Sequence, residues 1–575
     1  MKFDDILVEI GVFGKYQKVL GVLLYLCAIP LSEHAIAQVF LAAKTDHWCT
    51  VPDSQSLNCS SLESDCLELQ KELTLPFTVD EDGNTVYSEC ERYLNARSSL
   101  DQGVSNLTDG QDDGWANETI ACDAGWEYDR SQYKTTVIQD FDLVCAKGDM
   151  SGFAQSVFFA GFLSGSLIWG AVADWAGRRP TFFVCVTMSL VSATSVSFMP
   201  NFASFAAMRF FVAAGNYGIY LMAFILVSEI VGPEYRVQVG TMLSVLFALG
   251  YVLLSLLAYL LREWRHLQLA LSLPISIFLL YFIFLPESPR WLISKKRYKE
   301  AKMVIDKIAE VNGTQVPENL FDDPEDHDEK EKTSESSTSR QPTHIDLFRT
   351  PNMRKKTLNL LYNWFVSGFV YYGLSLSTSS LGIDPYIAAF VSGTVDFPAF
   401  FSSWYFMQRF GRRISVCCYL GIAGLACLIT SCISPGVGRA VVAMIGKFGI
   451  AGSFNAIYTL SVELYPTPIR TIGVGLSSMS ARISGTLAPV ILLLGKFWEP
   501  LPLVIFGTSA VVAGALTLLL PETLNQPLPE TIEEGEIFGK GQSFYLMTPK
   551  ESCKPEPSSS DTKYKHIPDE EHTQV

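Results

Sequence analysis

Long apolar runs recur along most of this 575-residue chain and limit what it can fold into. The runs 19–43, 153–173, 237–261 and 267–285 each hold roughly 20 mostly apolar residues, the length that a membrane-spanning helix needs. A helix of that length crosses the ~30 Å hydrocarbon core of a bilayer. A helix on the surface of a soluble protein carries a polar face at the helical period, which these runs lack. The sequence therefore predicts an all-α membrane protein.

Twelve such spans can be placed, so both chain ends are expected on the same side of the membrane. The expected spans are 19–43, 151–173, 180–199, 203–227, 237–261, 267–286, 357–380, 386–407, 414–433, 440–460, 472–494 and 500–520. Most loop cations fall on the side of the termini, among them Arg178, Arg179, Arg236, Arg409, Arg412, Arg413 and Arg470. The positive-inside rule places that side, with both termini, in the cytoplasm.

The segment 44–150, between the first two spans, is acidic, with 22 Asp and Glu against 7 Lys and Arg. It contains six cysteines, which are Cys49, Cys59, Cys66, Cys90, Cys122 and Cys145. It also contains three glycosylation sequons, which begin at Asn58, Asn106 and Asn117. Cysteines and sequons together indicate an oxidising, extracellular space. We expect disulfides and glycans here, and the sequence leaves the pairing of the cysteines open.

Composition also argues against several functions. The net charge of −16 speaks against a nucleic-acid partner, because proteins that bind nucleic acids carry basic surfaces. No CxxC pair, no metal-type spacing of Cys and His, and no cluster of catalytic residues stands out. The chain is therefore expected to be neither an enzyme nor a metal protein, and to need no cofactor.

Three motifs occur twice, which indicates an internal repeat. Gly177-Arg178-Arg179 recurs 234 residues later as Gly411-Arg412-Arg413, Glu229 with Arg236 recurs after 234 as Glu463 with Arg470, and Pro286-Glu287-Ser288 recurs after 235 as Pro521-Glu522-Thr523. Each motif follows the same span of its half, so we expect two six-helix halves that run parallel in sequence. The expected divisions are a cytoplasmic N-terminus 1–18, a first half 19–286 with the extracellular loop 44–150, a cytoplasmic linker 287–356, a second half 357–520 and a cytoplasmic tail 521–575.

The motifs resemble those of a known superfamily of transporters. Residues 170–179 (GAVADWAGRR) match the G-x-x-x-D-x-x-G-R-R signature of the major facilitator superfamily, and 286–292 (PESPRWL) resemble its sugar-porter signature. The second copy of the first signature has Gln408 in place of the Asp. The resemblance implies a substrate site between the halves, near the bilayer midplane. It also implies a gating network at the cytoplasmic helix ends, made of Asp174, Arg178, Arg179, Glu229, Arg236, Glu287, Arg290, Glu463 and Arg470.

Further stretches resemble solute carrier family 22, the transporters of organic cations, anions and zwitterions such as carnitine. They are 125–129 (GWEYD), 141–145 (FDLVC), 364–374 (WFVSGFVYYGL), 446–448 (GKF) and 458–467 (YTLSVELYPT), and the likeness covers roughly 5–535. It implies alternating access by rocking of the two halves.

Ionisable residues inside spans are expensive, so they are functional candidates. They are Glu33, His34, Arg209, Asp396, Lys447 and Arg482. In the family, cation members resemble one another in having Asp at the position of Arg482, whereas anion and zwitterion members have Arg there. An Arg offers a planar fork for a carboxylate, and its alternative partner is Asp396. Phe400 matches a position where anion members usually have Lys, and Lys447 can line the cavity or extend to the interface. Glu33 and His34 can form a titratable pair that couples protons or holds a cation, or they can lie at a wet helix end.

Four rings of the seventh span, Tyr362, Phe365, Phe369 and Tyr372, fall on one helical face. Rings hold quaternary ammonium groups by cation–π contacts of roughly 0.5–2 kcal/mol, although aromatic packing between helices explains such a stripe equally well. The expected substrate-binding set is Arg482, Asp396, Lys447, Tyr362, Phe365, Tyr372, Phe400 and Glu33.

We therefore expect a plasma-membrane transporter of small organic zwitterions or cations. The alternatives are an organic anion transporter and a non-transporting receptor or sensor on the same scaffold. A coupling ion, sodium or proton, is left open. The last residues, Thr573-Gln574-Val575, suit strand addition to a PDZ-domain protein.

Overall fold

The computed structural model describes residues 3–50, 71–72, 74–79, 85–94, 118–316 and 343–540. Several sequence predictions lie outside these ranges: the sequons at Asn58, Asn106 and Asn117, the cysteines Cys59 and Cys66, and the C-terminal Thr573-Gln574-Val575.

The first bundle of helices is formed by residues up to 312. Its elements are α1 (Phe3–Ile10), α2 (Lys15–Tyr25), α3 (Ala28–Ile36), α4 (Gln38–Leu41), α7 (Val137–Asp140), η2 (Cys145–Lys147), α8 (Met150–Ala176), α9 (Arg178–Val196), α10 (Phe202–Ile230), η3 (Pro233–Tyr235), α11 (Arg236–Leu260), α12 (Trp264–Ser272), η4 (Leu273–Ile283), α13 (Pro289–Ser294) and α14 (Tyr298–Asn312). The expected first span is divided into α2, α3 and α4. Pro30 has no N–H to donate to the carbonyl of Leu26, which explains the interruption before α3.

The second bundle begins after the segment that follows α14. Its elements are α16 (Asp346–Arg349), α17 (Pro351–Leu376), η5 (Thr378–Ser380), α18 (Pro385–Phe410), α19 (Arg412–Thr430), α20 (Val437–Leu464), η6 (Thr467–Ile469), α21 (Arg470–Leu493), η7 (Leu494–Lys496), α22 (Leu501–Thr517) and α23 (Ile532–Ile537). Every expected span coincides with helix. Nine helices of the described ranges are long and apolar enough to cross a membrane. The other three are α17 and α18, with 26 residues each, and the 17-residue α22.

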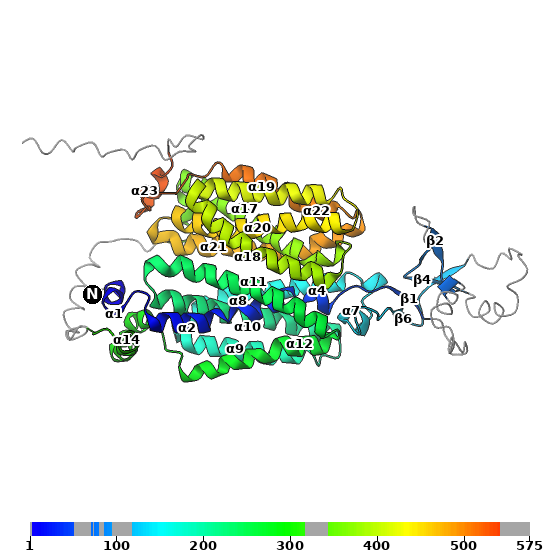
Figure 1. The fold of residues 1–575 in the computed structure, drawn as a ribbon, viewed down its shortest axis with the longest axis horizontal. Coiled ribbons are helices and arrows are strands. Elements are labelled where there is room, and N and C mark those ends of the chain that lie inside the picture. The colour runs from blue at the N-terminus through cyan, green and yellow to red at the C-terminus, as the bar shows by residue number, and fades with distance from the viewer. Residues whose placement is uncertain are drawn as a thin grey trace, which may run out of the picture.

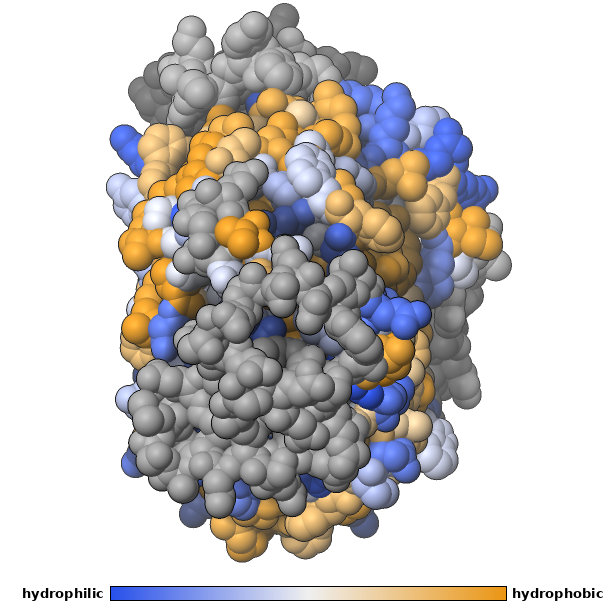
Figure 2. Space-filling view, turned by 90° about the vertical axis from the view of Figure 1, so that its right-hand side faces the viewer, coloured by the Kyte–Doolittle hydropathy of each residue, from blue (hydrophilic) through white to orange (hydrophobic). Residues whose placement is uncertain are grey.

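The two bundles lie side by side with their long helices roughly parallel (Figure 1). Two separate apolar cores fill them, and α8 packs against α21 while α11 packs against α18 to join them. Helices α1, α14 and α23 lie at one end, which we call the terminal end, and the strands lie at the other, the loop end. Large apolar side chains such as Trp175, Phe198 and Ile283 are exposed, as expected for a surface in contact with lipid. Seen from the loop end, apolar residues occupy much of the rim of the bundles (Figure 2).

At the loop end, short strands form three antiparallel pairs: β1 (His47–Cys49) with β6 (Trp126–Tyr128), β2 (Phe77–Val79) with β3 (Thr85–Tyr87), and β4 (Glu91–Tyr93) with β5 (Thr119–Ala121). Disulfides join Cys49 to Cys122 and Cys90 to Cys145. The expectation of disulfides in this loop is thus confirmed for four of the six cysteines. The structure also settles their pairing, which the sequence left open.

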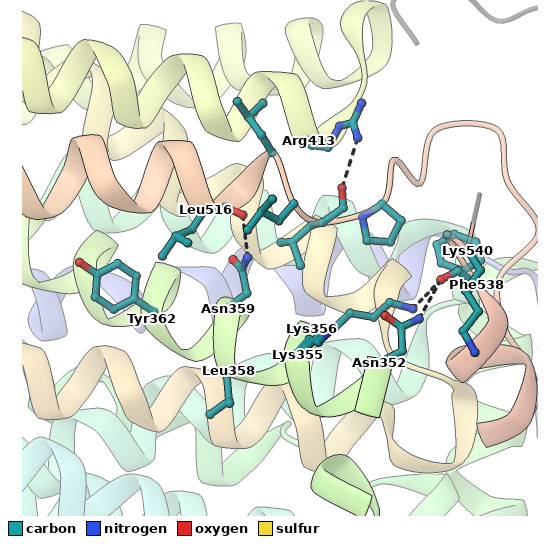
Figure 3. Close-up of a pocket in the computed structure, with 15 residues that line it drawn as sticks. Asn352, Lys355, Lys356, Leu358, Asn359, Tyr362, Arg413, Leu516, Phe538 and Lys540 are labelled. Carbon is teal, nitrogen blue, oxygen red and sulfur yellow. Dashed lines mark hydrogen bonds between the residues drawn. The ribbon is translucent and has the colours of Figure 1, made fainter. Parts of the chain in front are cut away.

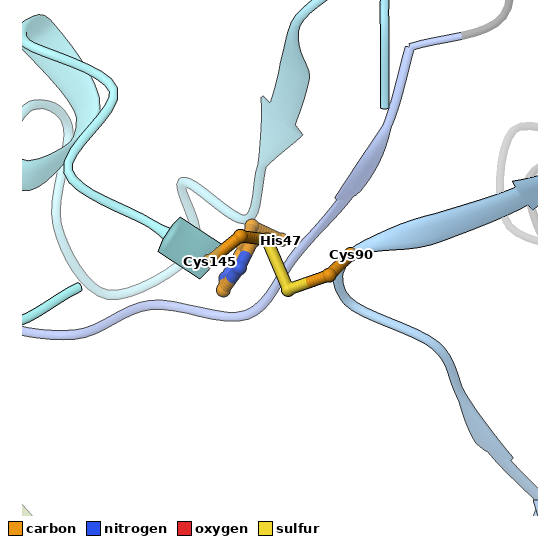
Figure 4. Close-up of side chains that lie close together, drawn as sticks. All are labelled: His47, Cys90 and Cys145. Atoms are coloured by element: carbon orange, nitrogen blue, oxygen red, sulfur yellow. A yellow bond between two sulfur atoms is a disulfide. The ribbon is translucent and has the colours of Figure 1, made fainter. Parts of the chain in front are cut away.

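His47 lies close to the disulfide of Cys90 and Cys145 (Figure 4), a grouping that resembles a metal site. The two sulfur atoms are bonded to each other, so neither is a thiolate, the form that binds metal. His47 Nε2 lies 3.8 Å from Glu89 Oε2. These residues therefore do not fit a metal ion.

Candidate functional site

Arg482 extends from the middle of α21 toward the other bundle and is only partly buried. Its Nη1 donates to the carbonyl and the hydroxyl of Ser478, one turn earlier, and its Nη2 donates to the hydroxyl of Tyr217 on α10 at 3.3 Å. Its Nε has no partner among the described residues. The guanidinium is therefore fixed by neutral groups, and its described contacts include no carboxylate.

A continuous group of rings lies beside this guanidinium. It consists of Phe159, Phe162, Tyr217 and Tyr372, and we call it the aromatic wall. Centroid distances are 4.6 Å for Tyr372–Phe159, 6.4 Å for Phe159–Phe162 and 4.6 Å for Phe162–Tyr217. The guanidinium carbon of Arg482 lies 5.5 Å from the ring of Phe162 and 5.1 Å from that of Tyr217. Helices α8, α10, α17 and α21 thus bring a cation and several ring faces to one place between the bundles.

Asp396 and Lys447 form a buried pair inside the second bundle. Lys447 Nζ lies 3.8 Å from Asp396 Oδ2, and the two side chains are 2% and 0% exposed. Tyr371 donates its hydroxyl to the same oxygen at 2.7 Å, and Lys447 donates to the hydroxyl of Ser375 at 2.5 Å. Lys447 also lies 3.3 Å from the ring centroid of Tyr371. The alternative in which Asp396 pairs with Arg482 is wrong in this structure, because Asp396 faces α17 and α20 instead.

Of the other expected binding residues, Tyr372 lies in the aromatic wall beside Arg482, and the rest lie elsewhere. Phe365 and Phe369 contact each other, and Phe369 packs on Phe506 of α22, while Tyr372 belongs to the aromatic wall. Tyr362 lines a cavity near the terminal end. The four rings that share one face of α17 therefore have different neighbours, because α17 packs against several helices along its length.

Phe400 and Glu33 are both only 6% exposed. Phe400 belongs to the core of the second bundle. Glu33 lies in the buried helix α3, next to His34, whose carbonyl accepts a hydrogen bond from Arg209 at 3.2 Å. Arg209 also donates to Gln155 Oε1 at 2.9 Å and lies over the ring of Phe158, an arrangement that holds α3, α8 and α10 together.

The expected gating residues of the first bundle meet at the terminal end. Arg178 Nη2 lies 3.0 Å from Glu229 Oε1 and 3.1 Å from Asp174 Oδ1. A second bond, from Arg178 Nε to Glu229 Oε2, makes the Glu229 pair bidentate. The side chain of Glu229 is 17% exposed and that of Asp174 is 76% exposed. Because exposed ion pairs contribute little, Glu229 is the stronger partner.

Glu287 ties this cluster to the end of the sixth span. Its carboxylate accepts the backbone N–H groups of Arg178 at 2.9 Å and Arg179 at 3.2 Å. Burial raises the pKa of Glu287, and these N–H bonds together with the charge of Arg178 oppose the increase. Arg290 Nε donates to the carbonyl of Glu229 at 3.1 Å.

The second bundle repeats this arrangement with one member missing. Arg412 Nη2 lies 2.9 Å from Glu463 Oε1, and Thr523 donates to Glu463 Oε2 at 2.6 Å. Glu522 accepts the backbone N–H groups of Arg412 at 2.8 Å and Arg413 at 3.1 Å. With Gln408 in place of the Asp, the second network contains no counterpart of the Asp174–Arg178 pair.

A glycine precedes the arginines in both copies for a steric reason. Gly177 and Gly411 have φ of +105° and +94°, in the region that favours glycine. A Cβ at either residue would collide with the carboxylate of Glu287 or Glu522. The remaining gating candidates lie next to the networks: Arg236 donates to the carbonyl of Ser228, and Arg470 donates to that of Tyr465.

Sequence reasoning missed several members of these sites. Arg412 and Glu522 stand at the repeat positions of Arg178 and Glu287, so the repeat itself was the signal that could have identified them. Phe162 and Tyr217 carry no such signal, because nothing in their own spans indicates that they face Arg482.

The described polar contacts between the bundles lie toward the loop end or the middle of the membrane. Asp149, before α8, pairs with Lys496, after α21. Tyr386 of α18 donates its hydroxyl to the carbonyl of Gln132 at 3.3 Å. The rings of Phe40, Tyr133 and Tyr259 surround Tyr386. By contrast, each of the two ion networks at the terminal end lies within a single bundle.

The networks lead to a prediction about turnover. Replacing Glu229 with Gln removes a partly buried, charge-assisted pair, so we expect the maximal flux to change by about tenfold. Replacing the exposed Asp174 with Asn should change the maximal flux by a smaller factor. Glu463→Gln is the matched variant in the second bundle. Uptake curves for several substrates provide the measurement, and a changed ranking of substrates with maximal flux intact would contradict a gating role.

Several known proteins are similar to this chain in sequence or in fold. Residues 109–534 match the family model described as "Sugar (and other) transporter". An "Organic cation transporter protein" of Drosophila melanogaster is 38% identical over 94% of this chain and 95% of its own length. The human "Organic cation/carnitine transporter 2" is 34% identical over 92% of this chain and 93% of its own length.

Among solved structures, the partially occluded inward-open xylose transporter XylE from E. coli superposes with a TM-score of 0.52 and 15% identity, covering 67% of this chain and 90% of that one. At that identity, the likeness shows the fold alone. The relatives are transporters and not enzymes. This chain therefore belongs to the major facilitator superfamily, as a multi-pass membrane transporter of the solute carrier family 22 type.

Proposed function

We propose that this protein carries small organic zwitterions or cations, of the carnitine or betaine kind, across the plasma membrane by alternating access. The observation that carries the proposal is Arg482, a half-buried arginine between the bundles whose described partners are neutral. A substrate carboxylate fits the guanidinium fork, and a quaternary ammonium group fits the faces of the aromatic wall. A zwitterion can use both at once.

The names of the relatives support this substrate class. One relative is an organic cation transporter, and another is an organic cation/carnitine transporter. Carnitine combines a quaternary ammonium group with a carboxylate, the two groups that the site around Arg482 accommodates.

The organic anion alternative is less well supported by the charges around the site. Asp396 neutralises Lys447 at 3.8 Å, and Phe400 occupies the position where anion members have a further Lys. Among the described residues next to the aromatic wall, Arg482 is then the cation available for a substrate, and a single cation beside several rings suits a zwitterion better than a dianion.

Alternating access in this protein would use the two ends of the bundles differently. The contacts of Lys496 and Tyr386 support a closed loop end in this conformation. The networks around Arg178 and Arg412 would bias the equilibrium between the inward-open and outward-open states without touching the substrate. Rocking of the two bundles needs no cofactor. Whether transport depends on sodium or protons can be measured in the flux assay described next.

The test is flux into proteoliposomes that contain the purified full-length chain. We expect uptake of a labelled zwitterion such as carnitine or betaine, with competition by tetraethylammonium, a cation without a carboxylate. Uptake of p-aminohippurate alone would support the anion alternative. Binding without flux would support the receptor alternative.

Orientation gives a prediction of its own. We place 1–18, 287–356 and 521–575 in the cytoplasm and 44–150 outside the cell, so Asn58, Asn106 and Asn117 should carry glycans. The sequon at Asn312 should not, because its Nδ2 already donates to the carbonyl of Ile10 at 2.9 Å and to Gln17 Oε1 at 3.0 Å. Glycosidase digestion of single Asn→Gln variants measures occupancy. A glycan on Asn312 would reverse the orientation, and with it the expectation that Thr573-Gln574-Val575 meets a cytoplasmic PDZ domain.

A further inference from the structure

A cavity lies in the second bundle at the terminal end, between α17, α22 and the segment after α23 (Figure 3). Its volume is about 690 Å³. Four of the residues that line it are basic, and no Asp or Glu is among them. The basic residues are Lys355, Lys356, Arg413 and Lys540.

Helix α23 builds one side of this cavity by docking on the first turn of α17. The carboxylate of Glu536 accepts the backbone N–H groups of Asn352 and Met353, both at 3.0 Å. Lys356 Nζ donates to the carbonyls of Gly535 at 2.8 Å and Phe538 at 2.7 Å. Figure 3 shows the side chains of Lys356 and Asn352 reaching together toward Phe538. Because carbonyls are neutral, the charge of Lys356 is solvated by them but not cancelled.

Arg413 adds an unsatisfied donor to the same cavity. Arg413 is almost fully buried, with only 5% of its surface exposed. Its Nη1 lies 3.4 Å from the carbonyl of Leu520, which is a long hydrogen bond, and its Nε has no partner among the described residues. A buried guanidinium N–H without an acceptor is unfavourable, so an acceptor oxygen supplied by a ligand would stabilise it.

Two carboxylates near the cavity, Glu522 at the backbone N–H of Arg413 and Glu536, offset the charge of the four basic residues only in part. Lys540 pairs with Glu536 at 3.5 Å, but this carboxylate also accepts two backbone N–H groups. Lys355 is exposed, and no ion pair of its side chain is described. The cavity therefore keeps an excess of positive charge.

The position of the cavity relative to the membrane identifies the chemistry that fits it. Helices α17 and α22 are membrane spans, and Leu358 and Leu519 in the lining are 54% and 72% exposed. Leucines exposed at the ends of spans contact acyl chains, while cations at the same level meet lipid headgroups. A soluble anion would use the cations but not these leucines.

We propose that this cavity binds the headgroup of an anionic membrane phospholipid, with the phosphate at Arg413 and Lys355 and the acyl chains along the leucines of α17 and α22. Occupancy would fix α23 against α17, since Asn352, Lys356 and Phe538 line the cavity and also take part in the docking of that helix. The site is separate from Arg482, so it can be tested whether or not the proposed substrate is correct.

The test measures lipid binding by the purified full-length protein in nanodiscs of phosphatidylcholine, titrated with phosphatidylserine. Replacing Lys355 and Lys540 with Gln removes two surface cations, so we expect about 30-fold weaker binding. Arg413→Lys keeps the charge but removes the Nε donor, so about tenfold weaker binding is expected.

The control is the double variant Lys302→Gln and Lys307→Gln on α14, which removes the same charge from exposed residues at the terminal end of the first bundle. It should bind as the wild type does, and thermal melting should show that all variants are folded. Equal weakening in the control would overturn the proposal in favour of a diffuse surface charge. Full competition by inorganic phosphate would overturn it in favour of a free-anion site.

Discussion

Replacing Arg482 with Ala is expected to lower zwitterion uptake by at least about 100-fold, while the protein still reaches the cell surface. The estimate follows from the loss of two charge-assisted hydrogen bonds to a carboxylate, each worth ~1.5–3 kcal/mol. Surface expression should persist because the described bonds of Arg482 to Ser478 and Tyr217 are few and partly solvent-exposed. Lysine keeps the charge but loses the fork, so Arg482→Lys should retain about a tenth of the uptake.

The ratio of two uptake rates makes this experiment independent of the amount of protein at the surface. Zwitterion uptake is divided by uptake of a cation without a carboxylate, which we expect to use the aromatic wall but not the fork. The ratio should collapse in Arg482→Ala, and Arg482→Asp should favour the simple cation because it reverses the charge. Arg439→Ala is the matched control, since this arginine of the same bundle pairs with Glu499. An unchanged ratio in Arg482→Ala would show that another residue recognises the carboxylate.

Breaking the Asp396–Lys447 pair is expected to destabilise the protein more than any other single change discussed above. Both side chains are at most 2% exposed, and removing one partner of such a pair leaves an uncompensated buried charge, at a cost of ~3–5 kcal/mol. Lys447→Met and Asp396→Asn should each lower the thermal midpoint and the amount of protein at the surface. The double variant should recover most of the loss, because two neutral groups of similar size replace the pair.

Thermal melting of the purified variants measures this coupling. The pair of Asp149 with Lys496 is the control, because its side chains are 63% and 46% exposed and Lys496→Gln should cost no more than ~1 kcal/mol. If Lys447→Met is as stable as the wild type and yet inactive, Lys447 contacts the substrate directly and the pair is not structural. Normal stability together with normal transport would show that Lys447 neither stabilises the fold nor contacts the substrate.

Much of this protein is determined by local patterns in its sequence. The apolar runs identify the spans, because a segment of about 20 apolar residues is stable in a bilayer only as a helix. The repeat of motifs at an interval of 234 or 235 residues identifies two related halves, and the resemblance of these motifs to the superfamily signatures implied the terminal-end networks. Arg178 and Glu229 meet because each stands at a helix end on the same side of the membrane. Cysteines within one acidic segment likewise indicated disulfides, which Cys49–Cys122 and Cys90–Cys145 confirm.

Only the tertiary structure decided which groups inside the membrane meet. By sequence, Asp396 was an alternative partner for Arg482, whereas the packing of α17, α18 and α20 places it 3.8 Å from Lys447. The rings of α17 share a face of an isolated helix, but Phe369 packs on α22 while Tyr372 faces α8. The helical period fixes which side chains share a face, whereas the partner of that face comes from helices that are far away in sequence. Partners inside the bundles are therefore set by the three-dimensional arrangement of whole helices, and no local pattern encodes it.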